Sequence, residues 1–174
     1  MRLSFSIKRI VNFWRGRRVR SNKDQINTTK LGAEQQLKLN NLLRVRDEQG
    51  ILADDALEEY GRLVGENSSF FIKEKQRSAL VKGLLKTEAE QGVLGLNELQ
   101  LLGETAGINS VVFKKAKNRT TVIASLLKTR GVQGRLNQDQ LKRLMEVARE
   151  ESALFKRIFK EDLGGDIGQL YHNM

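Results

Sequence analysis

The sequence contains no proline and no cysteine. An average chain of this length would carry roughly eight prolines at about 5% usage, so their absence favours uninterrupted helices and leaves the 15 glycines as the main turn signals. The lack of cysteine excludes disulfide bonds and thiolate metal sites, and it favours a reducing compartment, the cytoplasm or a virion interior, with an organelle left open. No apolar run approaches the roughly 20 residues that a membrane-spanning helix needs. We therefore expect a soluble or peripheral helical protein.

Residue types that carry out catalysis are also scarce. The single histidine, His172, lies close to the end of the sequence and is interpreted as a tail residue rather than a base. No glycine-rich phosphate loop follows a strand, and no pair of histidines on a helix offers metal ligands. We therefore expect no enzymatic activity, no cofactor, no metal site and no small-molecule substrate.

A repeated phrase dominates the rest of the chain. Glutamine-glycine-x-leucine begins at Gln49, Gln91 and Gln133, so the three copies align with a constant period of 42 in the sequence numbering. Residues 49–88 and 91–130 then share 16 identical positions out of 40 without a gap. The third copy is less complete, and a half copy precedes the first. Such a period is typical of helical repeats, in which each unit buries its apolar face only by stacking on its neighbours.

Each copy predicts two helices joined by a short corner. The glycine of the phrase would close the preceding helix in the left-handed conformation, and the leucine after it would enter the core. A polar residue would then cap each new helix by accepting hydrogen bonds from its free amide groups. The expected caps are Asp55, Asn97 and Asp139 for the first helix and Ser68, Ser110 and Ser152 for the second. The second helix carries the broad apolar stripe, and its Phe113 is expected to be more deeply buried than Phe155 of the worn last copy.

The same phrase also looks like half of a calcium-binding loop. If Gly92 is placed at the sixth position of such a loop, Glu98 falls at the twelfth, as the motif requires. The first, third and fifth positions are then Thr87, Ala89 and Gln91, which lack carboxylates. We therefore favour the helix-to-helix corner over a metal site.

The predicted fold class is all-α, a short array of three helix-pair repeats with this period of 42, either solenoid-like or a compact bundle, with an amphipathic basic helix at the N-terminus. Residues 1–23 would form a basic arm and residues 24–174 the helical repeat domain. Its units would be a half copy at about 27–48 and full copies at 49–90, 91–132 and 133–174.

The net charge of +10 is concentrated at one end of the chain. Residues 1–30 hold nine Lys or Arg and one acid, a balance of +8, whereas residues 31–174 hold 22 basic and 20 acidic groups. Clustered cations of this kind neutralise phosphates, and such binding weakens steeply with salt. The candidate polyanion-binding residues of this arm are Arg2, Lys8, Arg9, Arg15, Arg17, Arg18 and Arg20.

The same arm carries an apolar face at helical spacing. Its members are Leu3, Ile7, Ile10, Val11 and Trp14. An amphipathic helix with Arg, Lys and a bordering tryptophan is typical of an interfacial membrane binder, and the segment also resembles a mitochondrial targeting sequence. This face could instead pack on the repeat domain or dock on a partner helix, and the sequence leaves these alternatives open.

Further cations recur on the second helix of each copy. Lys75 and Lys86, and then Lys117 and Lys128, lie opposite the apolar stripe and are expected to line up as one basic ridge when the copies stack. Arg77 and Arg119 fall on the apolar side instead. There they would either cap the C-terminal carbonyls of a neighbouring helix or line a positively charged groove.

These observations favour a non-enzymatic structural or scaffold protein of a larger assembly, such as a virion or ribonucleoprotein, whose arm contacts nucleic acid or another polyanion. The expected partners are other protein subunits, with nucleic acid or an anionic membrane surface as further candidates. The two alternatives are a peripheral membrane protein that binds anionic lipid through its arm and a protein-protein adaptor.

Overall fold

A computed structural model of the chain describes residues 31–164. These residues form seven α-helices and no β-strand, which confirms the all-α fold class for this part of the chain. They belong to the second of the two parts into which the chain divides, residues 31–174. The helices are α2 (Ala33–Gln49), α3 (Asp54–Val64), α4 (Ser69–Gln91), α5 (Leu96–Ala106), α6 (Val111–Gln133), α7 (Gln138–Ala148) and α8 (Ala153–Leu163).

Helix boundaries recur with the period of the repeated phrase. The short helices α3, α5 and α7 begin at Asp54, Leu96 and Gln138, and each has 11 residues. The long helices α4 and α6 have 23 residues each and begin one period apart. α8 begins one further period along, at Ala153, but ends at Leu163 after 11 residues. Long and short helices therefore alternate along the chain until α8, which is about half as long as α4 and α6.

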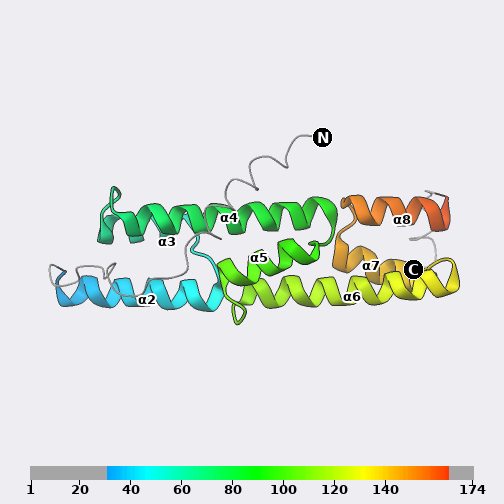
Figure 1. Ribbon diagram of the computed structural model, residues 1–174, viewed down its shortest axis with the longest axis horizontal. Coiled ribbons are helices and arrows are strands. Elements are labelled where there is room, and N and C mark those ends of the chain that lie inside the picture. The colour runs from blue at the N-terminus through cyan, green and yellow to red at the C-terminus, as the bar shows by residue number, and fades with distance from the viewer. Residues whose placement is uncertain (1–30, 165–174) are drawn as a thin grey trace. The chain divides into compact units, whose positions relative to one another are not determined.

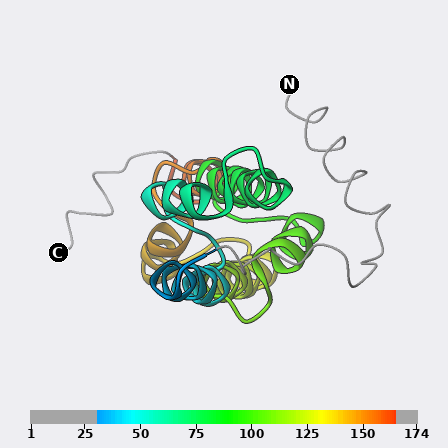
Figure 2. The ribbon, with the colours of Figure 1, turned by 90° about the vertical axis from the view of Figure 1, so that its left-hand side faces the viewer.

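The long helices lie end to end in two rows (Figure 1). α2 is followed by α6 in one row and α4 by α8 in the other, and contacts join the ends of both pairs. Viewed along the rows, α5 lies on one side of them and α7 on the other (Figure 2). Consecutive long helices are therefore in opposite rows, and only every second one shares a row.

Apolar side chains from both rows and from the short helices form the core. The leucines of the repeated phrase, Leu52, Leu94 and Leu136, are between 0% and 2% exposed, which confirms that they enter the core. One buried cluster joins residues of α4, α5 and α6, and another joins residues of α6, α7 and α8. Short helices pack chiefly on the long helices before and after them, so the core continues from one helix pair to the next.

The second helix of each pair begins as expected. The hydroxyl oxygens of Ser68, Ser110 and Ser152 accept hydrogen bonds from the backbone N–H three residues later, at 3.2, 3.3 and 3.3 Å. Each serine therefore supplies an acceptor for an amide that has no partner within its helix.

The caps predicted for the short helices are wrong by two residues. The residues at these positions are Ala53, Gly95 and Asn137, so Asp55, Asn97 and Asp139 lie inside the first turn. A side chain from the third helical position serves the N-terminus of α5 instead, because the Glu98 carboxylate accepts a hydrogen bond from Gly95 N–H at 2.9 Å. Acidic side chains in a first turn also interact favourably with the helix dipole, which explains acids there without a cap.

Candidate functional site: helix junctions and exposed basic side chains

Most of the sequence-predicted binding residues lie outside the described residues. These are Arg2, Lys8, Arg9, Arg15, Arg17, Arg18 and Arg20 of the basic arm and Leu3, Ile7, Ile10, Val11 and Trp14 of its apolar face. His172 also lies outside them. The roles assigned to these residues therefore stay predictions.

The four candidate lysines of the repeat domain are exposed but do not form one ridge. Lys75 and Lys86 lie on α4, and Lys117 and Lys128 lie on α6. Because α4 and α6 lie in opposite rows, the equivalent lysines are carried by separate rows (Figure 1). Lys86 approaches Glu90 at 3.8 Å, whereas no ion pair joins the other three to another described residue. The expected single ridge is wrong because stacking places successive units on alternate rows.

Arg77 caps the ends of two other helices, as one of the two sequence interpretations expected. Its Nε donates to the carbonyl of Thr105 at 2.8 Å, near the end of α5. A terminal guanidinium nitrogen donates to the carbonyl of Gly50 at 3.1 Å, just after α2. A guanidinium at this position satisfies carbonyls that lack partners and interacts favourably with the negative ends of both helices. Arg119, at the equivalent position of α6, instead pairs with the buried Glu88 at 3.2 Å.

The end-to-end contact between α2 and α6 is formed by a glycine and a serine. Gly50 closes α2 with φ +89°, and its N–H donates to the carbonyl of Arg46 at 2.7 Å. A Cβ atom at Gly50 would lie 2.7 Å from Ser110 Oγ and 3.0 Å from the Cβ of Ala106. Both the left-handed backbone and the close approach of α6 therefore require glycine at this position.

The contact between α4 and α8 repeats this geometry. Gly92 closes α4 with φ +91°, and a Cβ atom there would lie 2.7 Å from Ser152 Oγ and 3.2 Å from the Cβ of Ala148. Ser152 is completely buried by this contact. We call each of these two contacts a helix junction: a corner glycine of one long helix meets the cap serine of the next helix in the same row.

Gly134, the corner glycine of α6, has no such neighbour. It also adopts the left-handed conformation, with φ +81°, but no heavy atom of the described residues lies within 4 Å of a Cβ placed there. Gly50 and Gly92 are buried, whereas Gly134 is exposed. At the opposite end of the described residues, the cap serine Ser68 is half-buried, whereas Ser110 and Ser152 are fully buried.

Ion pairs with buried acids join consecutive long helices, and sequence reasoning did not find them. Glu74 of α4, 5% exposed, lies between Arg77 at 2.8 Å and Arg46 of α2 at 3.6 Å. Glu88 of α4 pairs with Arg119 of α6, as described above. The signal for Glu88 was its place four residues after Leu84, on the apolar stripe of α4, where a charged side chain needs a buried partner.

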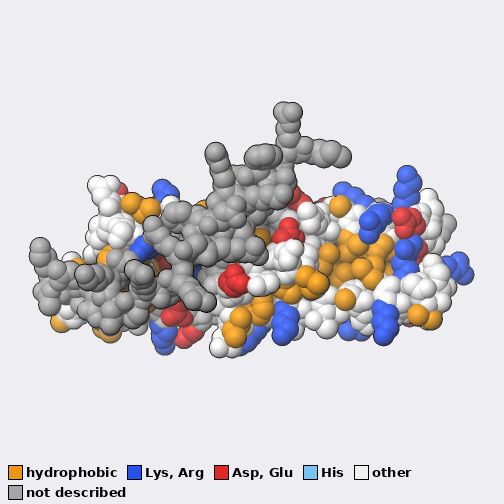
Figure 3. All heavy atoms as spheres, viewed as in Figure 1, with side chains coloured by type: hydrophobic (Ala, Val, Ile, Leu, Met, Phe, Trp, Pro, Cys, Tyr) orange, Lys and Arg blue, Asp and Glu red, His pale blue; other side chains and the backbone are white. Residues whose placement is uncertain are grey.

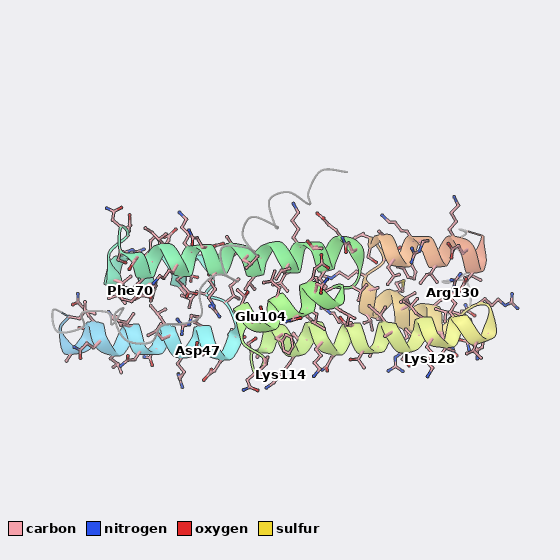
Figure 4. All side chains as sticks on the ribbon, viewed as in Figure 1. Asp47, Phe70, Glu104, Lys114, Lys128 and Arg130 are labelled. Atoms are coloured by element: carbon pink, nitrogen blue, oxygen red, sulfur yellow. The ribbon has the colours of Figure 1, made fainter. Side chains whose placement is uncertain are left out.

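A third ion pair joins α6 to α8. Arg130 lies between the two helices (Figure 4), 2.6 Å from Asp162 and 2.8 Å from Glu161. The Asp162 carboxylate also accepts a hydrogen bond from Leu136 N–H at 2.8 Å, which attaches the third corner to α8. Burial alone would raise the pKa of Asp162. The hydrogen bonds from Arg130 and Leu136, with the charges of Arg130 and Arg135, outweigh burial and hold this pKa below its usual value.

Two surface features border this end of the described residues. A hollow of about 370 Å³ lies beside Gly134, lined by Gln133, Leu136, Asp162 and Leu163 among others. Hydrophobic side chains also gather on the face between α8 and α6, beyond the end of α5 (Figure 3). Both features are open surfaces that a protein partner could cover.

Within residues 31–164 no cluster of three acidic or histidine side chains is placed to hold a metal ion. No helix among these residues is both long enough and apolar enough to cross a membrane. Comparisons with protein-family models, curated proteins and solved structures find no match to this chain. The arrangement of the described side chains therefore provides the structural grounds for a functional proposal.

Proposed function

We propose that this chain is a non-enzymatic structural or scaffold protein of a larger assembly, such as a virion or ribonucleoprotein. Its frame is a short array of three helix pairs, one for each copy of the repeated phrase, with incomplete units at both ends. The recurrence of helix boundaries, cap serines and corner glycines with the same period supports the array. The basic segment at residues 1–30 attaches the frame to nucleic acid or another polyanion.

The charge contrast between the two parts of the chain carries this proposal. Residues 1–30 combine nine cations with one acid. In the described part the cations of the inner surfaces are already matched: Arg46 and Arg77 face Glu74, and Arg130 faces Asp162. The surplus of positive charge available to a polyanion is therefore concentrated in the arm, where phosphate neutralisation with counterion release would favour binding.

The test is a salt titration of binding to labelled duplex DNA and single-stranded RNA, followed by fluorescence anisotropy. A variant with Arg15, Arg17, Arg18 and Arg20 changed to Gln should bind more weakly. Its slope of log affinity against log salt concentration on the duplex should be shallower by about 3 to 4, because each lost phosphate contact removes about 0.9.

A matched control removes the same number of charges from the repeat domain. The variant with Lys75, Lys86, Lys117 and Lys128 changed to Gln has the same net charge as the arm variant. We expect it to retain more of the affinity and of the salt slope. Equal losses in the two variants would show that net charge, and not the arm, governs binding, and an unchanged slope in the arm variant would refute the proposed contact.

A second candidate function is attachment to a membrane surface, which the apolar face of residues 3–14 favours. In this case Trp14→Asp should reduce co-sedimentation with liposomes that contain anionic lipid, because a charge on the apolar face opposes burial among the acyl chains. Equal co-sedimentation of the variant and the original chain would exclude the membrane function. A protein-protein adaptor is the third candidate, and the apolar face between α8 and α6 supports it (Figure 3).

A further inference from the structure

The two ends of the array carry the two halves of a helix junction. At the α6 end the corner glycine Gly134 is exposed, and no described atom faces it within 4 Å of a Cβ position. At the α4 end the cap serine Ser68 is half-buried, although its equivalents in the two formed junctions are completely buried. Each end therefore has the residue type that its missing partner would contact in a formed junction.

The α6 end also differs in polarity from the formed junctions. Val132 lies two residues before the corner glycine and is 83% exposed. The residues at the equivalent positions of α2 and α4 are Glu48 and Glu90, both exposed acids. An apolar residue has thus replaced an acid at the one described corner that has no neighbour.

The α4 end shows the complementary difference. Ile72 lies four residues after the cap serine and is 46% exposed, whereas the equivalent residues of α6 and α8 are Lys114 and Lys156. Exposure alone does not distinguish these ends, because Leu96 is also 82% exposed. The distinguishing feature is the pairing: glutamate and lysine positions flank each formed junction, and valine and isoleucine occupy the same two positions at the open ends.

The incomplete long helices at the two ends are also complementary in length. α8 supplies the positions that correspond to residues 69–79 of α4. In α2 the first buried residue is Leu39, and from there to Gln49 the helix supplies the positions of residues 81–91 of α4. Together these two 11-residue segments cover a 23-residue long helix with one position between them.

We propose that a second copy of this chain docks on the α6 end, so that its Ser68 meets Gly134 of the first copy and its α2 continues α8 of the first. The inference rests on the proposed scaffold function and names one of its protein partners. Residues 33–38 would leave the row of α8, and apart from the half-buried Leu31 and Gln36 the segment that precedes Leu39 is exposed. The contact joins unlike ends, so it repeats from copy to copy and produces an open polymer rather than a closed dimer.

The first thirty residues are a poorer occupant of the Ser68 end. The segment that corresponds to the repeated phrase one period before Gln49 is Ile7-Lys8-Arg9-Ile10. Lys8 stands where a formed junction has glycine, and a side chain at that position would collide with the serine, as the 2.7 Å distances at Gly50 and Gly92 indicate. A second copy supplies the glycine that this segment lacks.

The experiment is sedimentation velocity of the full chain, freed of nucleic acid by nuclease treatment and a high-salt wash, over a hundredfold range of concentration. The average mass should rise steadily from the 19.8 kDa of one chain without stopping at a dimer. Val132→Glu and Ile72→Lys should each give monomers, because every contact in either sample would include an altered residue. A monomer at all concentrations in the original chain would overturn the proposal.

Mixing the two variants tests the polarity of the contact. In an equimolar mixture, Val132 of one variant can still meet Ile72 of the other, so at least dimers should return. A mixture that stays monomeric, although both variants show the helical content and the unfolding midpoint of the original chain, would refute the head-to-tail contact.

Two controls separate other occupants. Leu96→Asp removes an equally exposed apolar side chain away from both ends, and its equivalent residue in α3 is already Asp54. This variant should assemble like the original chain, and loss of assembly here but not in Val132→Glu would overturn the proposal. If the full chain is monomeric and only a variant lacking residues 165–174 assembles, the tail and not a second copy occupies the α6 end. Assembly is measured without nucleic acid, so a failure of the polyanion contact leaves its outcome unchanged.

Discussion

Substitution of Gly92 by alanine measures how tightly the α4–α8 junction is packed. The substitution has two costs: an L-residue in the left-handed region loses about 1–2 kcal/mol, and forced overpacking loses typically about 1–3 kcal/mol. The new Cβ would lie 2.7 Å from Ser152 Oγ and 3.2 Å from the Cβ of Ala148, and both residues are at most 1% exposed, so neither can move aside into solvent. Reduced freedom of the unfolded chain returns about 0.4–1 kcal/mol. We therefore expect a loss of about 2–4 kcal/mol in the free energy of unfolding.

Gly134→Ala is the matched control. Its φ of +81° imposes a similar backbone cost, but no described atom lies near the new Cβ. We expect a loss of only about 0.5–1 kcal/mol, so the difference between the two variants isolates the steric contribution. The assay is urea unfolding at equilibrium, followed by circular dichroism in dilute solution, where copies do not associate. A change in midpoint with an unchanged slope identifies a change in stability.

A double-mutant cycle identifies the side chain responsible. Ser152→Gly removes the atoms nearest to the new Cβ, so it should recover about 1 kcal/mol or more of the loss when combined with Gly92→Ala. Equal losses in Gly92→Ala and Gly134→Ala, within about 0.5 kcal/mol, would refute the close junction, and so would a cycle without coupling.

The remaining predictions concern stability at three other places. Phe155→Ala should lower the free energy of unfolding by about 3–5 kcal/mol, because Phe155 is 1% exposed and stacks on a neighbouring ring, whereas the half-buried Phe113 should cost less in the same urea assay. Arg149→Gly should stabilise the chain by about 1 kcal/mol, visible as a higher melting temperature, because Arg149 is the only non-glycine described residue with positive φ, and relief of about 1–3 kcal/mol of strain exceeds the entropy cost of glycine. Asp162→Asn should lose about 2 kcal/mol at neutral pH, because it leaves the partly exposed Arg130 without its carboxylate. The pKa of Asp162 is lowered in the folded chain, so its contribution is present above the unfolded value of about 3.9 and is lost as the pH falls through the lower folded value. The two proteins should therefore converge in stability in acid, and a constant difference down to low pH would contradict the assigned ion pair.

Local features of the helix pairs could be predicted from the sequence because they depend on neighbouring residues. The cap serines and the left-handed corner glycines follow from hydrogen-bond needs and backbone sterics that act within a few residues. The predicted caps at Asp55 and Asp139 were wrong because a first-turn acid and a cap acid differ by only two positions and both stabilise a helix N-terminus.

Tertiary features could be predicted only in part. Phe155 was expected to be less buried than Phe113, yet α8 packs its ring against α7 and against Phe159. Position in the sequence was a poor guide because the stacking of helices, and not the completeness of a repeat, determines burial. The ion pairs of Glu88 and Asp162 involve residues 31 and 32 positions apart, and a self-comparison of the sequence does not reveal contacts between helices.

The alternation of long helices between two rows changes how surface positions should be compared along this chain. A straight partner that followed the α4–α8 row would meet Lys75 and Lys86 but not Lys117 or Lys128, although both pairs occupy equivalent places in their helices. Selection for such a partner would act on side chains spaced by two helix pairs, and each row could evolve its own specificity. One chain could in this way hold two different strands, one along each flank.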